Sequence, residues 1–151
     1  MWYTTIYTDG ACRGNGRARN KGAWAAWLTT HNDAGESREL MLSKGTRDTT
    51  NQAMELTAVV AGLAGLKKPT PVTVVTDSRW VIDGATKWIP KWIARGWKKA
   101  DGREPKHLEL WAALNDLLNI HDVRFRHVRG HTGNTGNEKA DAECNRVMDN
   151  M

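Results

Sequence analysis

Hydrophobic and polar residues alternate over the first part of the chain and recur at helical spacing after it. Residues 2–9, 23–31 and 38–45 are rich in β-branched and aromatic side chains and predict three strands. A Gly-rich basic loop is expected over 11–22, and a turn over 32–36 joins the second and third strands. From Thr50, a plausible N-cap, apolar residues recur three and four positions apart, which predicts a helix that continues to about residue 68.

The second half of the chain alternates strands with helices. A short buried strand is expected at 72–76 and another at 123–128, with helices at 107–118 and 137–148. The last helix should turn its apolar residues inward: Ala140, Cys144, Val147 and Met148. Helical residues are also expected from about 78. Because proline is tolerated in a first turn but not in a helix interior, Pro90 predicts that a new helix begins near 88–90.

This order of elements predicts the fold class. Three consecutive strands favour an antiparallel meander, and strands that alternate with helices favour parallel neighbours beside it. We therefore expect an α/β fold with a mixed five-stranded sheet flanked by helices. A chain of 151 residues suits one domain, spanning 1–151, with one core.

Composition excludes several classes of protein. No apolar run approaches the roughly 18 residues that cross a bilayer, so no membrane association is expected. The first residues lack both the basic start and the apolar core of a signal peptide, which predicts a cytoplasmic location. Cys12 and Cys144 provide neither a disulfide framework nor metal-ligand spacing, so both are expected to be reduced thiols.

Positive charge is concentrated in one stretch, residues 87–106, here called the basic segment. It carries seven Lys or Arg and two acidic residues, a net charge of +5 that equals the net charge of the whole chain. Such a segment predicts an anionic partner. Trp88 and Trp92 within it are four positions apart and are predicted to pack, whereas Trp97 follows a glycine among basic residues.

Four carboxylates adjoin predicted apolar faces. Asp9 and Asp77 follow two strands, and sites in open α/β sheets form at the carboxyl ends of strands. Glu55 and Asp141 lie among apolar residues of their helices. One such acid alone would be interpreted as a cap or a surface charge. Four indicate a cation site, because two carboxylates about 4 Å apart repel by roughly 4 kcal/mol at an effective dielectric near 20. Oxygen ligands suit Mg²⁺ or Mn²⁺.

Four sequence blocks carry these acids: "TDGACRGN" (8–15), "MEL" (54–56), "TDS" (76–78) and "GHTGNTGNEKAD" (130–141). In order and spacing they resemble the signature blocks of type 1 ribonuclease H, over residues 3 to 148. The resemblance implies the ribonuclease H-like fold and endonucleolytic hydrolysis of the RNA strand of RNA–DNA hybrids. It also implies two Mg²⁺ ions, with Mn²⁺ possible, and products with 5′-phosphate and 3′-hydroxyl ends. The implied catalytic residues are Asp9, Glu55, Asp77 and Asp141 as metal ligands and His131 as a mobile proton-transfer group.

The resemblance further implies contacts to the nucleic acid. The implied contacts are Asn15, Asn51 and Gln52 in the minor groove, Thr50 at a DNA-strand phosphate, and Trp97, Lys98 and Lys99 in the basic segment. Ordinary turn and capping roles are the alternative for the residues near the metals. The chain departs from the family pattern at Ala53, Arg79 and the loop 16–21, all close to the expected substrate groove.

Two other hypotheses stay open from the sequence. A DNA-processing nuclease can share this fold, because a fold does not determine a reaction. A non-catalytic hybrid-binding module is the third hypothesis, although phosphates would bind more easily without the carboxylates. No obligate protein partner is indicated, and a monomer is expected.

Overall fold

Five strands form one mixed sheet in the computed structural model, which describes residues 1–129 and 135–151. The order across the sheet is β3-β2-β1-β4-β5. β1 pairs antiparallel with β2, and β2 with β3, whereas β1–β4 and β4–β5 are parallel pairs. The predicted mixed α/β sheet is thus confirmed. The strands are β1 (Trp2–Arg13), β2 (Lys21–Asn32), β3 (Ser37–Arg47), β4 (Pro71–Thr76) and β5 (Asp122–His127).

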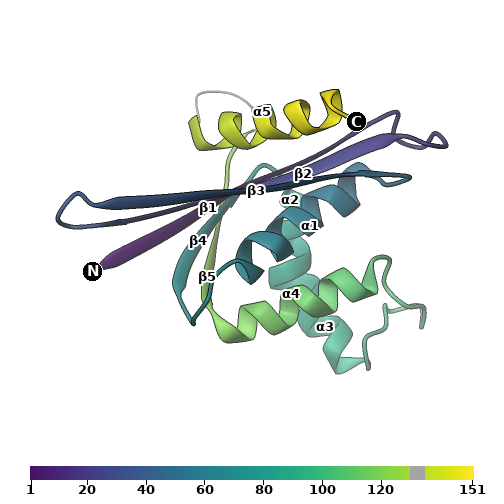
Figure 1. The fold of residues 1–151 in the computed structure, drawn as a ribbon. Helices are drawn as coiled ribbons and strands as arrows, with labels where there is room; N and C mark the ends of the chain where they lie inside the picture. Colours follow the sequence, from purple (N-terminus) through teal and green to yellow (C-terminus); the bar gives the residue numbers. More distant parts are fainter. Residues whose placement is uncertain (130–134) are drawn as a thin grey trace.

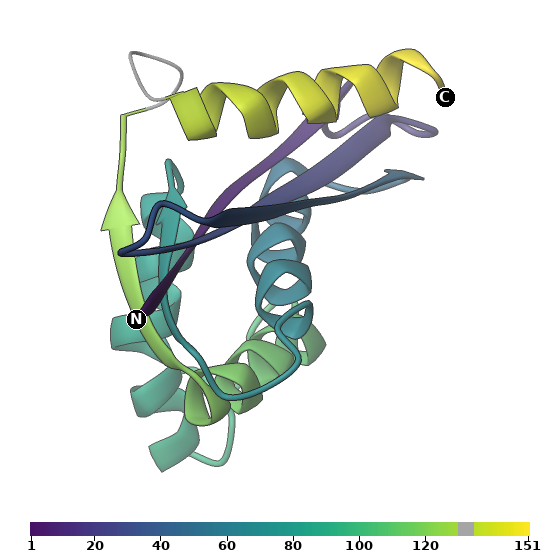
Figure 2. The same cartoon turned by 60° about the vertical axis from the view of Figure 1, so that its left-hand side comes forward.

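Helices cover both faces of the sheet unequally (Figure 1). The helical elements are α1 (Asn51–Ala64), α2 (Arg79–Asp83), η1 (Gly84–Trp88), α3 (Ile89–Ala94), α4 (Leu108–Ile120) and α5 (Thr135–Asp149). Helix α5 lies alone on one face, and α1 to α4 lie on the other (Figure 2). The larger core lies between the sheet and α1 and α4, and includes Ile6, Leu56, Val74, Trp111 and Leu114.

The smaller core lies under α5. It joins Ala23 and Ala25 of β2 to Ala140, Cys144 and Met148, with Val147 packed beside them. The residues predicted to face inward on the last helix therefore do so. Both cysteines are free, and Cys144 is buried. Within residues 1–129 and 135–151, we find no helix with the length and apolar character that a membrane span requires.

Two predicted boundaries are wrong. Five of the twelve residues in the expected loop 11–22 are strand, because β1 and β2 keep pairing as far as Arg13 and Lys21. Residues 14–20 connect the two strands, and Gly14 and Gly16 adopt positive φ angles of 76° and 87° there, which glycine tolerates. Helix α1 ends at Ala64, four residues before residue 68, where the amide of Gly65 donates to the carbonyl of Ala61.

Pro90 does not interrupt the helical backbone. The residue before α3, Trp88, has helical dihedral angles of −83° and −44°, so α2, η1 and α3 follow one another without a break. The amide of Ile89 donates to the carbonyl of Gly84, a π-type bond that replaces the usual spacing at this point. The predicted start near 88–90 matches α3, but it begins within a continuous helical run.

Candidate active site

Asp9 and Asp77 lie side by side where β4 ends. The parallel pairing of β1 with β4 reaches Tyr7 and Val75, and Asp77 follows the last residue of β4. The sequence had suggested that the first strand ends before Asp9, but the strand continues past this residue. β1 continues because its other neighbour, β2, still pairs with it, and Asp9 lies opposite Ala25. The adjacency of the two carboxylates is therefore as expected, although the expected strand end is wrong.

Glu55 reaches the same place from the second turn of α1. The helix crosses β1 at Gly10, where an added Cβ would lie 2.3 Å from the backbone nitrogen of Glu55. Thr50 caps the helix as predicted, with its hydroxyl oxygen accepting from the amide of Ala53 at 3.1 Å. One carboxylate oxygen from each of Asp9, Glu55 and Asp77 lies within 4.8 Å of the other two.

Burial and mutual repulsion make these acids hard to ionise. Asp9 is only 3% exposed. Burial raises the pKa of Asp9 from 3.8 to about 8, and the charges of Asp77 and Asp141 add to the effect. Burial also raises the pKa of Glu55 well above its usual value, with Asp9 and Asp77 contributing. A cation bound between these oxygens would offset both effects, because its charge stabilises the ionised carboxylates.

A buried oxygen without a partner supports the same conclusion. Oε2 of Glu55 is buried and has no hydrogen-bond partner among the described residues. Such an atom is costly to leave unsatisfied. The carboxylates of Glu55, Asp9 and Asp77 together form an all-oxygen donor set, which fits a hard divalent cation. The residues present therefore fit a metal site.

Asp141 joins the site from α5. Its charge and a hydrogen bond to Asp9 both raise the pKa of Asp9, so the two side chains are in contact. Its backbone carbonyl accepts from the side-chain amide of Asn145 at 3.2 Å. The structure thus gathers all four predicted acids. His131, the predicted proton-transfer group, lies outside the described residues.

The predicted minor-groove residues meet at the N-terminus of α1. Asn51 and Gln52 occupy its first turn and are exposed, and Thr50 is its cap. Oδ1 of Asn15, from the loop after β1, accepts from the amide of Asn51 at 3.2 Å. Ala53 follows in the same turn, where its amide is used by the Thr50 cap.

Sequence reasoning missed one residue that holds this region together. Asn20 is 8% exposed, and its side-chain amide donates to the carbonyl of Thr49 at 2.9 Å and to that of Arg17 at 3.0 Å. Its Oδ1 accepts from the amide of Thr49 at 2.9 Å. Asn20 therefore ties the loop 16–21 to the chain just before α1. An asparagine in a Gly-rich loop gives no sequence signal that separates this role from ordinary turn formation.

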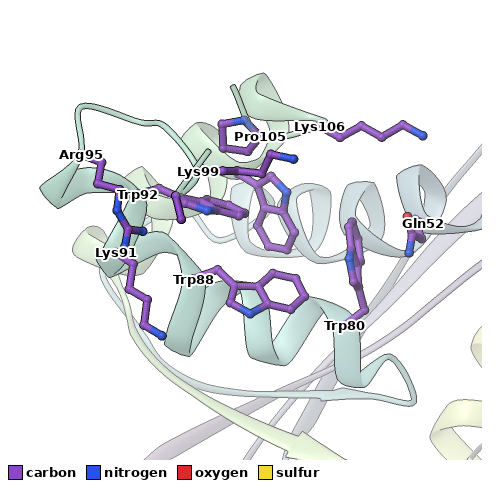
Figure 3. Close-up of a pocket in the computed structure, with 11 residues that line it drawn as sticks. Gln52, Trp80, Trp88, Lys91, Trp92, Arg95, Lys99, Pro105 and Lys106 are labelled. Carbon is purple, nitrogen blue, oxygen red and sulfur yellow. The ribbon is translucent and has the colours of Figure 1, made fainter. Parts of the chain in front are cut away.

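An aromatic hollow of about 430 Å³ is lined by residues of the helical run 79–94, by residues 99–106 at the end of the basic segment, and by Gln52 of α1 (Figure 3). We call it the tryptophan hollow. Trp88 and Trp92 pack together as predicted, with ring centroids 6.1 Å apart, but they also line this hollow. Its lining residues are Gln52, Trp80, Trp88, Lys91, Trp92, Arg95, Lys99, Ala100, Pro105, Lys106 and Trp111.

Basic side chains surround the rings of the tryptophan hollow, and Gln52 stands beside Trp80 (Figure 3). Lys98 and Lys99 are exposed. Trp97 is half-buried against the larger core, with a positive φ of 65° and its amide donating to the carbonyl of Trp92. Arg79, the first residue of α2, is exposed. The tryptophan hollow is basic, because four of its lining residues are lysine or arginine: Lys91, Arg95, Lys99 and Lys106.

Comparison with known proteins matches this geometry to one family. The family model described as RNase H matches residues 2–148. The chain is 44% identical over 151 residues to the ribonuclease H of Cupriavidus necator, covering 100% of this chain and 99% of the relative. It is 46% identical over 141 residues to ribonuclease HI of Pseudomonas aeruginosa, covering 93% and 90%. The crystal structure of LC9-RNase H1, a type 1 RNase H with the type 2 active-site motif, matches with a TM-score of 0.86 and 30% identity, over 98% of this chain and 72% of that one.

Proposed function

Since this chain belongs to the ribonuclease H family, whose members cleave RNA in RNA–DNA hybrids, we propose that its clustered carboxylates perform this cleavage. The observation that carries the assignment is the meeting of Asp9, Glu55 and Asp77 within 4.8 Å. A site that only binds nucleic acid gains nothing from clustered acids, because carboxylates repel phosphates when they are ionised.

Two divalent cations, Mg²⁺ or alternatively Mn²⁺, are proposed to bind to the four acids. When bound, they supply a water nucleophile and neutralise charge on the phosphate and on the leaving 3′-oxygen, giving 5′-phosphate and 3′-hydroxyl ends. Asp9 is assigned the central position between the two. In support, its pKa responds to both Asp77 and Asp141. Glu55 and Asp77 would hold one cation, and Asp141 the other.

His131 is proposed to move a proton or to assist product release. The support comes from the sequence alone: the histidine lies ten residues before Asp141 in the last signature block. An imidazole with an ordinary pKa near 6.5 suits proton transfer near neutral pH.

Substrate selection is proposed to occur at the N-terminus of α1. Asn15, Asn51 and Gln52 would read the minor groove, where the 2′-hydroxyl distinguishes RNA from DNA. Thr50 would hold a phosphate of the DNA strand. The contact between Asn15 and the backbone of Asn51 supports the assignment, because it places these polar groups together.

The basic segment is proposed to hold the nucleic acid backbone. Lys98 and Lys99 would meet phosphates, and Trp97 would contact the nucleic acid. The exposure of both lysines supports this assignment. We further propose that residues 1–151 form one ribonuclease H domain that works as a monomer in the cytoplasm. Light scattering during size-exclusion chromatography and cell fractionation test the last two points.

A cleavage assay tests the reaction. Labelled RNA–DNA hybrid, duplex DNA and duplex RNA are incubated with Mg²⁺ or with a chelator. We expect cleavage of the RNA strand of the hybrid only, and only with Mg²⁺. The control variant Asp149→Asn should cleave hybrid like the wild type. This exposed acid on α5 pairs with Arg13 at 2.6 Å and lies away from Asp9, Glu55 and Asp77. Cleavage of duplex DNA would instead favour a DNA-processing nuclease, and binding without cleavage would favour a hybrid-binding module.

A further inference from the structure

One face of β1 carries both an acid of the cluster and an arginine at the end of the strand. Side chains two positions apart on a strand point the same way, so Asp9, Ala11 and Arg13 share this face. Helix α5 lies over it (Figure 1), and Ala11 packs against the smaller core beneath that helix. Arg13 is therefore placed to contact the same helix that supplies Asp141.

Helix α5 presents a matching row of polar residues. Asp141, Asn145 and Asp149 are four positions apart, so they lie on one stripe of the helix. This stripe is about 12 Å long at the rise of a helix, and β1 covers about 13 Å from Asp9 to Arg13 at the rise of a strand. A hydrogen bond joins Asp141 to Asp9 at one end of the row. At the other end, Arg13 donates to Asn145 and to Asp149.

Asn145 is the middle of this row, and both ends of its side-chain amide are used. Its Oδ1 accepts from Nη2 of Arg13 at 3.0 Å. Because a guanidinium only donates, this contact fixes which end of the amide is the oxygen. The Nδ2 of Asn145 therefore faces Asp141, where it donates to the backbone carbonyl at 3.2 Å and to Oδ2 at 3.5 Å.

This arrangement holds the Asp141 carboxylate without neutralising it. An arginine bonded directly to the carboxylate would compete with a cation for its charge and its lone pairs. A neutral amide occupies one of about four acceptor sites on an ionised carboxylate and leaves the others for a cation. The guanidinium on the far side polarises the amide and strengthens its donation. Partners that orient a ligand in this way are a regular part of metal sites.

We propose that Asn145 is a positioning residue for Asp141 and that Arg13 acts through Asn145. The inference rests on the proposed function, because it takes Asp141 to be a cation ligand. Neither residue is assigned a contact with the cation or the substrate. Asp149 lies outside the proposed pair, since it accepts from the other nitrogen of Arg13, Nη1. An asparagine at position 149 would keep an acceptor oxygen there.

Binding of Mn²⁺ to the free protein tests the role of Asn145 without the reaction. Asn145→Ala should weaken it about tenfold in isothermal titration calorimetry, the lower end of what orienting partners contribute. Asn150→Ala is the matched control, because Nδ2 of Asn150 donates to the backbone carbonyl of Arg146, also four residues earlier, at 2.8 Å. Unchanged binding in Asn145→Ala, or an equal loss in both variants, would overturn the proposal.

The Mg²⁺ dependence of hybrid cleavage separates positioning from folding. In Asn145→Ala, the Mg²⁺ concentration for half-maximal rate should rise about tenfold, and saturating Mg²⁺ should restore most of the wild-type rate. The melting temperature in chelator should match the wild type. A rate loss that saturating Mg²⁺ does not restore would contradict a positioning role. Absence of cleavage by the wild type would contradict the proposed function instead, and the Mn²⁺ titration would still test Asn145.

Arg13→Ala distinguishes orientation from charge, because the two predict opposite signs. Loss of a positive charge near the acids would tighten Mn²⁺ binding. Loss of the hold on Asn145 should weaken it on the order of threefold, less than in Asn145→Ala. In the Asn145→Ala background, Arg13→Ala should add nothing, since residues of one hydrogen-bond network are not additive. Tighter or unchanged binding, or additive losses, would overturn the assignment of Arg13.

Discussion

The acid cluster and the basic segment differ in how they are built. Asp9 lies within a twelve-residue strand and Glu55 within a fourteen-residue helix, and the two elements touch backbone to backbone at Gly10. The basic segment instead contains the six-residue helix α3 and the end of the five-residue η1, and it has a positive φ angle at Trp97. One region is buried or half-buried and acidic, and the other is largely exposed and basic.

The difference fits the role that we propose for each region. Hydrolysis requires reacting groups held within fractions of an ångström, which long and mutually packed elements provide. Contact with phosphates is less demanding, because charges act over a Debye length of roughly 8–10 Å. Precision is therefore found where strands meet a helix, and positive charge where the chain is irregular. Four predictions test this division, from the largest expected effect to the smallest.

Asp9→Asn should reduce cleavage by at least about 10³-fold, because it removes the proposed shared ligand of both cations. Hybrid affinity should change little, since the proposed phosphate contacts lie in the basic segment. The melting temperature in chelator should hold or rise, because the variant removes an ionisable group that is buried among other acids. Single-turnover cleavage and hybrid binding are measured on the same preparation. Substantial residual cleavage would contradict the assignment of Asp9, and the Asp149→Asn variant controls for loss of a negative charge.

Gly84→Ala should destabilise the region that supports the basic segment. A Cβ at this position would lie 2.0 Å from the ring of Trp111, which is 1% exposed and cannot move without disturbing the core. Overpacking of this kind costs about 2–3 kcal/mol of unfolding free energy. We expect the folded fraction of the molecules to have a higher KM for hybrid and an unchanged kcat. Denaturant unfolding and steady-state kinetics check both values, and a fall in kcat alone would show that the two regions are not independent.

Lys98→Ala/Lys99→Ala should change binding without changing chemistry. Each phosphate contact contributes about −0.9 to the slope of log affinity against log salt, so the slope should flatten by at most about two units. Affinity should fall alike for hybrid and duplex DNA, because phosphates do not identify the strand.

Two further variants control this test of the basic segment. Lys67→Ala/Lys68→Ala changes two exposed lysines at the far end of the sheet and should leave the salt slope unchanged. Asn51→Ala should erode hybrid preference while leaving the slope unchanged. An unaltered slope in the Lys98/Lys99 variant would mean that the substrate binds elsewhere.

Stability without metal should depend on pH through the acid cluster. Asp9 has a pKa of about 8 in the folded chain against 3.8 as an ordinary side chain, so the folded state keeps a proton that the unfolded chain releases. Stability is therefore full below about pH 4 and falls as pH rises towards 8. We expect a loss of about 1–2 kcal/mol, smaller than for an isolated group because Asp9 and Glu55 titrate together.

Thermal unfolding in chelator across this pH range measures the loss. Asp9→Asn should flatten the dependence, and Mg²⁺ should restore stability at high pH. A wild-type curve that stays flat between pH 5 and 8 would contradict the raised pKa of the acid cluster.

Much of the fold and the acid cluster could be predicted from the sequence. Alternation and helical spacing located the strands and helices, and the apolar surroundings of Glu55 and Asp141 indicated their position. Strand length could not be predicted, because β1 extends past Asp9 only through its pairing with β2, and such pairing is not local in sequence. The tryptophan hollow was not predicted for the same reason. Trp111 and Trp80 are 31 positions apart and have ring centroids 5.0 Å apart.

The contact at Gly10 has a consequence for how sequence variation in this protein should be interpreted. Any side chain at position 10 would meet the backbone of α1 and push Glu55 away from Asp9. Selection for cleavage would then preserve a residue that contributes no chemical group. An alignment would rank this glycine beside the neighbouring aspartate, and invariance alone could not separate them. A directed-evolution library should therefore hold Gly10 fixed while it varies Ala11 and Cys12, whose side chains are partly exposed.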